Sequence, residues 1–126
     1  MPTGDDSTVA REYQRGLSLA RSGEWFEAHE AFELAWRAAD AGERDFFQGL
    51  VHVVVSAYQA SRGREVAATR QREKGLRRLA PFRPAHRGLD VDRVTAALQR
   101  AETDFRQHLV ECRVEPPAAV EEEQQP

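Results

Sequence analysis

The sequence predicts an all-α fold, a single compact bundle of about five helices with a central apolar third helix. Three observations support this prediction. Apolar residues recur at helical spacing through most of the 126 residues. Glycines and prolines interrupt that spacing at intervals typical of helix connections. Residues 44–61 are apolar on almost every side, as expected of a helix at the centre of its domain.

The first two predicted helices meet at Gly23. Ser7 is a suitable N-cap for the first helix, and glycine is common just past a helix C-terminus. The second helix is expected from about Glu24 to Asp40 and carries several large aromatic side chains. Because such side chains hold much of the apolar area available for burial, we expect them in the core. The aromatic residues concerned are Trp25, Phe26, Phe32 and Trp36.

Three further helices complete the prediction. The third spans about Arg44 to Ser61, Gly63 closes it, and a fourth, arginine-rich helix follows to about Leu79. Asp90 is a suitable N-cap for a fifth helix. The buried stripe of that helix is expected to consist of Val91, Val94, Leu98, Phe105 and Leu109.

Length and composition indicate one domain. We expect a frayed N-terminus at residues 1–6, a helical domain at 7–112, and a disordered acidic tail rich in Pro, Glu and Gln at 113–126. No apolar run approaches the ~20 residues that span a bilayer, and the N-terminus is acidic, so we expect a cytoplasmic protein without membrane association. The single cysteine, Cys112, excludes an intramolecular disulfide and a cysteine-based zinc site.

The candidate site lies on the aromatic face of the second helix. His29 and Glu33 are four residues apart, so both side chains can reach a common point. Polar groups in a buried face need partners, and the third helix has a polar stripe of its own. We therefore predict hydrogen bonds from His29 and Glu33 to Gln48 or His52, in a buried cluster between the two helices. The full candidate pocket comprises His29, Glu30, Glu33, Trp36, Gln48, His52 and Gln59.

The chemistry of this cluster has three interpretations: a structural hydrogen-bond network, a pocket for a small molecule or protein partner, or a metal site. The candidate metal ligands are His29, Glu33 and His52. Their spacing resembles the zincin HExxH helix, with Glu33 in place of the second histidine. A hydrolytic zinc site normally has three protein ligands, and His52 would have to come from another helix. No cofactor is predicted, and a divalent metal stays an alternative.

Three ordered motifs resemble those of the bacterial and archaeal family named domain of unknown function 309: His29-Glu30-x-x-Glu33-x-x-Trp36, Phe47-Gln48-Gly49-Leu50-Val51 and Gly88-Leu89-Asp90-Val91. The resemblance covers about Leu17 to Val94. It implies a small, all-helical, single-domain protein and brings no established activity. The chain departs from the family pattern at His52, where glutamine is usual, and at Gln59, where histidine is usual.

Residues 17–35 also look like a single tetratricopeptide unit, with small residues, a Gly-Glu-Trp-Phe turn and a second amphipathic helix. No second copy is found at the period of such repeats, and stacked repeats need at least three copies. A repeat-like helical hairpin inside a bundle is the better description. It keeps a binding function open.

Charge is unevenly distributed along the chain. Residues 62–93 contain ten Lys or Arg against four Asp or Glu, although the net charge is −3. The basic patch, which would suit phosphate, comprises Arg70, Lys74, Arg77, Arg78 and Arg83. The net negative charge and the lack of interleaved aromatics argue against a nucleic-acid partner.

We therefore favour a domain that binds a small ligand or a protein partner. The first alternative is a metal-dependent enzyme using His29, Glu33 and His52, and the second is phosphate or nucleic-acid binding by the fourth helix. Self-association into a homo-oligomer stays open.

Overall fold

The computed structural model describes residues 6–112; the expectations for the frayed N-terminus up to residue 5 and for the acidic tail 113–126 lie outside these residues. Within them the chain forms five α-helices: α1 (Asp6–Arg21), α2 (Trp25–Ala38), α3 (Arg44–Ser61), α4 (Glu65–Leu79) and α5 (Val91–Gln99). A short 3-10 turn, η1 (Ala80–Phe82), and two-residue strands β1 (Ala85–His86) and β2 (Leu89–Asp90) connect α4 to α5. The all-α prediction is confirmed. None of the helices in the described part is long and apolar enough to cross a bilayer.

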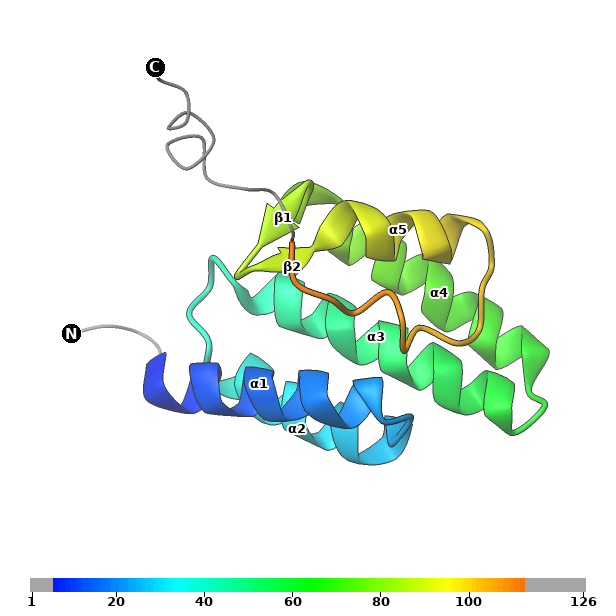
Figure 1. Ribbon diagram of the computed structural model, residues 1–126, viewed down its shortest axis with the longest axis horizontal. Coiled ribbons are helices and arrows are strands. Elements are labelled where there is room, and N and C mark those ends of the chain that lie inside the picture. The colour runs from blue at the N-terminus through cyan, green and yellow to red at the C-terminus, as the bar shows by residue number, and fades with distance from the viewer. Residues whose placement is uncertain (1–5, 113–126) are drawn as a thin grey trace, which may run out of the picture.

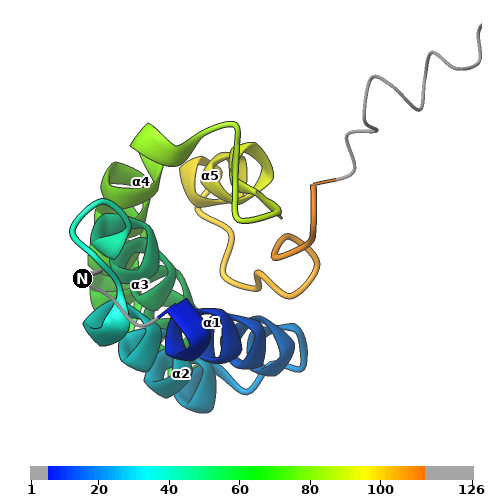
Figure 2. The same cartoon turned by 90° about the vertical axis from the view of Figure 1, so that its left-hand side faces the viewer.

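The first four helices form one curved layer in which each helix packs against the next (Figure 1). Figure 2 shows that this layer follows an arc around α5 and around the irregular segment that follows it, residues 100–112. Helix α3 lies in the middle of the arc, between α2 and α4. The prediction of a central third helix, with the bounds Arg44–Ser61, is therefore confirmed.

The layer consists of two helical hairpins with the same turn. Gly23 closes α1 with a φ of 77°, and Gly63, 40 positions later, closes α3 with a φ of 75°. Each glycine donates to the carbonyl three residues earlier, at 3.0 Å, and the following residue donates to the carbonyl five residues earlier, at 2.9 Å. This is the bonding of a Schellman cap, for which glycine is preferred because its φ is positive. A second hairpin therefore follows the repeat-like one, at a spacing longer than the tetratricopeptide period.

Helix α2 faces the core with a different side from the one predicted. Phe32 is fully buried as expected, together with small residues of α2: Ala28, Ala31 and Ala35. Phe26, in contrast, is 51% exposed, and Trp25 and Trp36 are only half-buried. The alanines let α2 approach its neighbours closely, and Gly16 of α1 leaves the space that the Phe32 ring fills. The prediction that all four aromatic side chains of this helix lie in the core was therefore wrong for Phe26.

Helix α5 is shorter than predicted. The Asp90 side chain caps it by accepting from the backbone N–H of Arg93 at 3.0 Å, as expected, but the helix ends at Gln99. Ala101 adopts a φ of 59°, and the N–H of Glu102 donates to the carbonyl of Ala97 at 3.1 Å. This Schellman-type ending turns the chain back, so Phe105 and Leu109 are buried from an irregular segment and not from α5.

Polar contacts fix the β-hairpin and the 100–112 segment to the helices. Arg87, in the turn of the hairpin, donates to both carboxylate oxygens of Glu43 at 2.7 and 2.6 Å. His86 adds a contact of 2.7 Å to the same carboxylate. The pKa of Glu43 is held below its ordinary value chiefly by the hydrogen bond from Arg87. Arg21 of α1 donates to the backbone carbonyl of Leu109. These contacts close the concave side of the layer.

Candidate functional site

The site residues predicted from the sequence lie along α2 and α3, and most of them are partly exposed to solvent. Glu30 is exposed, and the other six are half-buried: His29, Glu33, Trp36, Gln48, His52 and Gln59. None of the seven is fully buried. The predicted polar set is therefore a half-exposed strip and not part of the core.

A pocket of about 200 Å³ opens between the beginning of α2 and the end of α3. It brings together two of the predicted residues, His29 and Gln59, with apolar side chains of both helices: Trp25, Phe26, Val55 and Tyr58. The ring centroid of Phe26 lies 5.9 Å from those of both His29 and Tyr58. The pocket is therefore framed by aromatic rings with one imidazole among them.

His29 has a polar atom that needs a partner. Its Nδ1 is buried and has no hydrogen-bond partner among the described residues. Its Nε2 lies 3.9 Å from Oε2 of Glu33, which is beyond hydrogen-bond distance. Glu33 also lies 3.7 Å from the guanidinium of Arg37. A buried polar atom without a partner costs about 1–3 kcal/mol. A bound group that pairs with Nδ1 would recover that free energy.

The predicted hydrogen bonds between the two helices are not formed. His52 pairs with Gln71 of α4, with 2.7 Å between Nδ1 and Oε1, and no described contact joins it to His29 or Glu33. Helices α3 and α4 come close at Gly49 and Gly75, and Cβ of His52 lies 3.4 Å from where a Cβ on Gly75 would stand. This close approach brings His52 against α4. Burial and then the nearby cations, Lys74 first, lower the pKa of His52, and the hydrogen bond that His52 donates to Gln71 opposes them.

The candidate metal ligands are consequently not assembled. Within residues 6–112, no three His, Cys, Asp or Glu side chains are placed to hold one metal ion. His29 and Glu33 face each other on α2, while His52 points to α4. His52, the candidate third ligand of the metal alternative, is directed away from this pair because it packs against α4.

The basic patch is partly neutralised. Arg78 pairs with Asp45 and Arg83 pairs with Asp92, both at 2.6 Å. The remaining members, Arg70, Lys74 and Arg77, are exposed on α4. Because two of its five cations are already paired, the basic patch offers a weaker phosphate site than the sequence implied.

Two of the three family-like motifs have clear structural roles. In Phe47–Val51, Gly49 is required because a Cβ there would stand 2.7 Å from Cγ of Leu79. In Gly88–Val91, the glycine has a φ of 79° and the aspartate caps α5. The remaining motif, from His29 to Trp36, places its His and Glu at the half-exposed strip, where core packing does not require them. This motif is therefore the best candidate for function.

Sequence reasoning missed several residues near the pocket. Phe26 was expected in the core, yet it lines the pocket together with Tyr58 of α3. Arg62 follows α3 and lies over the Tyr58 ring, with 5.7 Å between its Cζ and the ring centroid. The exposure of Phe26 was signalled only by the alanines beside it, which can pack closer to neighbouring helices than an aromatic ring can.

No curated protein and no solved structure matches this chain. A family model described as a domain of unknown function (DUF309) matches residues 13–71, which run from α1 into α4 and include both hairpin turns and the pocket. Over these residues, the chain is similar to the family of the domain of unknown function DUF309.

Proposed function

We propose that this protein is a protein-binding module that takes one apolar side chain of its partner into the pocket between α2 and α3. One observation carries the proposal: His29, whose buried Nδ1 has no partner among the described residues, lines a pocket whose rim residue, Phe26, is 51% exposed. An aromatic side chain left in water beside an unsatisfied polar atom is typical of a surface that a partner covers.

The size of the pocket favours a protein partner over a free small molecule. Pockets for small molecules usually measure about 300–1,000 Å³. The pocket at His29 measures about 200 Å³, which is enough for one large side chain. A partner can insert that side chain as an anchor, and a rotation of the His29 ring would bring Nδ1 to one of the partner's backbone groups. The rest of the partner would cover the exposed face of Phe26.

Charges beside the pocket indicate what flanks the anchor. On the α3 side, Arg62 lies over the Tyr58 ring and Arg64 donates to Gln59 at 3.4 Å. Neither arginine has an ion-pair partner within the described part of the chain. On the α2 side, Glu30 is exposed. We therefore expect an acidic residue on the α3 side of the anchor and a basic residue on the α2 side. We also propose that the partner is cytoplasmic, as the composition indicates.

A display selection tests this proposal. A library of random peptides is selected on the wild-type protein, and enriched peptides are measured on single variants. We expect the peptides to share one large apolar residue and to lose at least tenfold in affinity on Phe26→Ser and on His29→Ala, which corresponds to about 1.4 kcal/mol. The matched controls are Leu34→Ser and Val66→Ser, because these side chains are also apolar and exposed, at 43% and 68%.

The outcomes separate clearly. Peptides that bind Phe26→Ser as well as they bind the wild type would contradict the proposal, as would equal losses on Leu34→Ser. A selection that enriches no peptide with an apolar anchor would contradict it too. His29→Gln adds a sharper measurement, because its amide can replace the hydrogen bond at Nδ1. It should therefore bind more tightly than His29→Ala.

A further inference from the structure

A second cleft, of about 350 Å³, lies where three separate segments meet. The turn between α1 and α2 forms one wall, the last turn of α3 a second, and residues 103–106 of the irregular segment the third. Its volume falls within the range of small-molecule sites, at the lower end. Trp25 lines this cleft and also the His29 pocket, so one half-buried indole separates the two.

The lining combines one apolar surface with several hydroxyl groups. Trp25 and two alanines, at positions 57 and 60, supply the apolar surface. The hydroxyl groups come from Ser22, Ser61 and Thr103, one from each wall. Ser61 donates its proton to the carbonyl of Tyr58 at 2.6 Å, so its oxygen still has lone pairs to accept. A ligand with a flat apolar face and a polar edge matches this lining.

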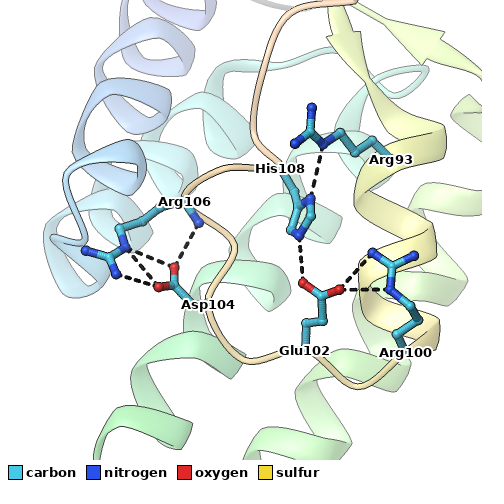
Figure 3. Close-up of polar contacts among 6 residues, drawn as sticks. All are labelled: Arg93, Arg100, Glu102, Asp104, Arg106 and His108. Atoms are coloured by element: carbon cyan, nitrogen blue, oxygen red, sulfur yellow. Dashed lines mark hydrogen bonds and ion pairs between the residues drawn. The ribbon is translucent and has the colours of Figure 1, made fainter.

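An ion pair supplies the charged groups of the cleft. Arg106 donates from Nε and Nη2 to the carboxylate of Asp104, and its backbone N–H donates to Oδ1 at 3.0 Å (Figure 3). The pKa of Asp104 is held below its ordinary value chiefly by this hydrogen bond from Arg106, so the carboxylate stays ionised at neutral pH. The remaining nitrogen, Nη1, has no hydrogen-bond partner among the described residues.

Gly23 places this guanidinium at the wall of the cleft. A Cβ at Gly23 would lie 3.4 Å from Cδ of Arg106 and 3.7 Å from Nη1, so the glycine lets the arginine lie against the turn. Gly23 itself lines the cleft. Both residues of the ion pair line the cleft, with the N–H groups of Nη1 left to donate and the carboxylate of Asp104 able to accept.

We propose that this cleft binds a neutral, polyhydroxylated ring of monosaccharide size. Adjacent hydroxyl groups on such a ring can accept from Nη1 of Arg106 and donate to Asp104 at the same time, while the C–H face of the ring packs on Trp25. Charged ligands fit less well. An anion attracted to Arg106 meets the carboxylate of Asp104, and a cation attracted to Asp104 meets the guanidinium.

Fluorescence titration tests the proposal. The chain has two tryptophans, so Trp36→Phe leaves Trp25 as the only indole reporter. D-glucose, D-galactose and D-mannose are titrated separately into this variant, with sodium phosphate as the anionic probe. We expect a saturable change in Trp25 fluorescence with at least one hexose and none with phosphate. Arg106→Ala and Asp104→Asn should each weaken hexose binding about tenfold or more, because each removes a hydrogen bond to a charged group.

The Arg83–Asp92 pair provides a matched control. Its arginine and aspartate side chains are 56% and 49% exposed, against 56% and 52% for Arg106 and Asp104, and it lies outside the cleft. Arg83→Ala should therefore leave hexose affinity unchanged. Absence of saturation with all three hexoses would overturn the proposal. Equal hexose affinity in Arg106→Ala, or saturable binding of phosphate alone, would overturn it as well.

Discussion

The two helical hairpins, α1–α2 and α3–α4, share a turn but differ in what they place on either side of it. Their glycines have φ values of 77° and 75°, and their turns contain the same hydrogen bonds. At the same 40-residue offset, however, Phe32 of the first hairpin corresponds to Arg72 of the second. Gly16 likewise corresponds to Ser56. The glycine and the hydrogen bonds of the turn therefore determine that a hairpin forms, while the positions facing neighbouring helices are free to diverge.

The neighbours explain that divergence. Helix α2 packs between α1 and α3, so its buried face is made of alanines and one phenylalanine. Helix α4 packs on α3 and α5 at the end of the layer, and its buried face includes Arg72, which is 7% exposed. Nη1 of Arg72 has no partner among the described residues. The pocket at His29 forms between the two hairpins, where α3 packs against α2.

The largest expected effect comes from the pair of positions 32 and 72. Phe32→Ala should lower the free energy of unfolding by about 3–5 kcal/mol, because it leaves a cavity in the core. Arg72→Met should change it by no more than about 1 kcal/mol, because the variant keeps most of the apolar stem and removes a buried charge that lacks a carboxylate partner. Urea unfolding followed by circular dichroism measures both values.

One contact qualifies this contrast. Arg72 donates to the hydroxyl of Thr69 at 3.0 Å, but Thr69 is exposed, so water can replace that bond. A loss in Arg72→Met comparable to that in Phe32→Ala would show that the guanidinium holds the second hairpin together. The expectation that position 72 of the second hairpin tolerates substitution better than position 32 of the first would then be wrong.

Positions 16 and 56 give the next largest effect. A Cβ on Gly16 would stand 2.5 Å from the Phe32 ring, so Gly16→Ala forces the ring or the helix to move. We expect a loss of about 1–3 kcal/mol, as for other overpacked cores. Ser56→Ala should cost less, because its hydroxyl bonds only to the carbonyl of Val53 in its own helix, at 2.6 Å. Thermal unfolding of both variants, with Phe32→Leu as a relieving second change in Gly16→Ala, measures the difference. An unshifted Gly16→Ala would contradict the packing described.

Much of the fold could be predicted because its signals are local. Gly23 and Gly63 mark helix ends by their own conformation, and Asp90 marks a helix start through its side chain. Ala101 ends α5 with the same cap, but alanine carries no such signal, so the predicted helix was extended to Leu109. The cleft residues Asp104 and Arg106 were missed for the same reason.

The site was predicted less well because its geometry depends on neighbours. The proximity of His29 and Glu33 was predicted from their spacing within one helix, which the sequence shows directly. The direction of His52 depends on how closely α3 approaches α4 at Gly49 and Gly75, and that approach is a property of two helices together. The exposure of Phe26 likewise depends on α2 turning its alanine face inward. The spacing of residues along one helix predicts neither the direction of His52 nor the exposure of Phe26.

The ends of α3 and α5 share one type of cap, and substitutions there should have opposite effects on stability. Gly63→Ala should cost about 1 kcal/mol, because a φ of 75° is unfavourable for alanine and no described atom lies within 4 Å to add a clash. Ala101→Gly should raise stability by about 0.5–1 kcal/mol, because glycine removes the strain of a φ of 59°. Differential scanning calorimetry measures both shifts. A lower melting temperature for Ala101→Gly than for the wild type would contradict this prediction. It would mean that packing of the Ala101 methyl group stabilises the protein more than the strain at Ala101 destabilises it.

The smallest expected effect concerns His52, which links α3 to α4 inside the second hairpin. Burial, with Lys74, Arg78 and Arg77 nearby, holds its folded-state pKa below the ordinary value of about 6.5. The unfolded chain therefore takes up a proton at a higher pH than the folded protein does. Above about pH 6.5 the imidazole is neutral in both states and contributes no pH dependence. As pH falls below that value, stability is lost until the folded state is protonated too.

His52→Gln isolates this contribution, because glutamine does not titrate and can still pair with Gln71. The difference in unfolding free energy, wild type minus variant, should fall as the pH is lowered from about 7 to 5, while the other histidines cancel because both proteins contain them. Adding Lys74→Ala to both proteins should shrink the fall, since one of the cations opposing protonation is then gone. A difference that rises with acid would contradict the prediction, because it would mean that the bond to Gln71 outweighs burial and that the contact between α3 and α4 favours the charged imidazole. A flat difference would contradict it too, because it would mean that the two effects cancel.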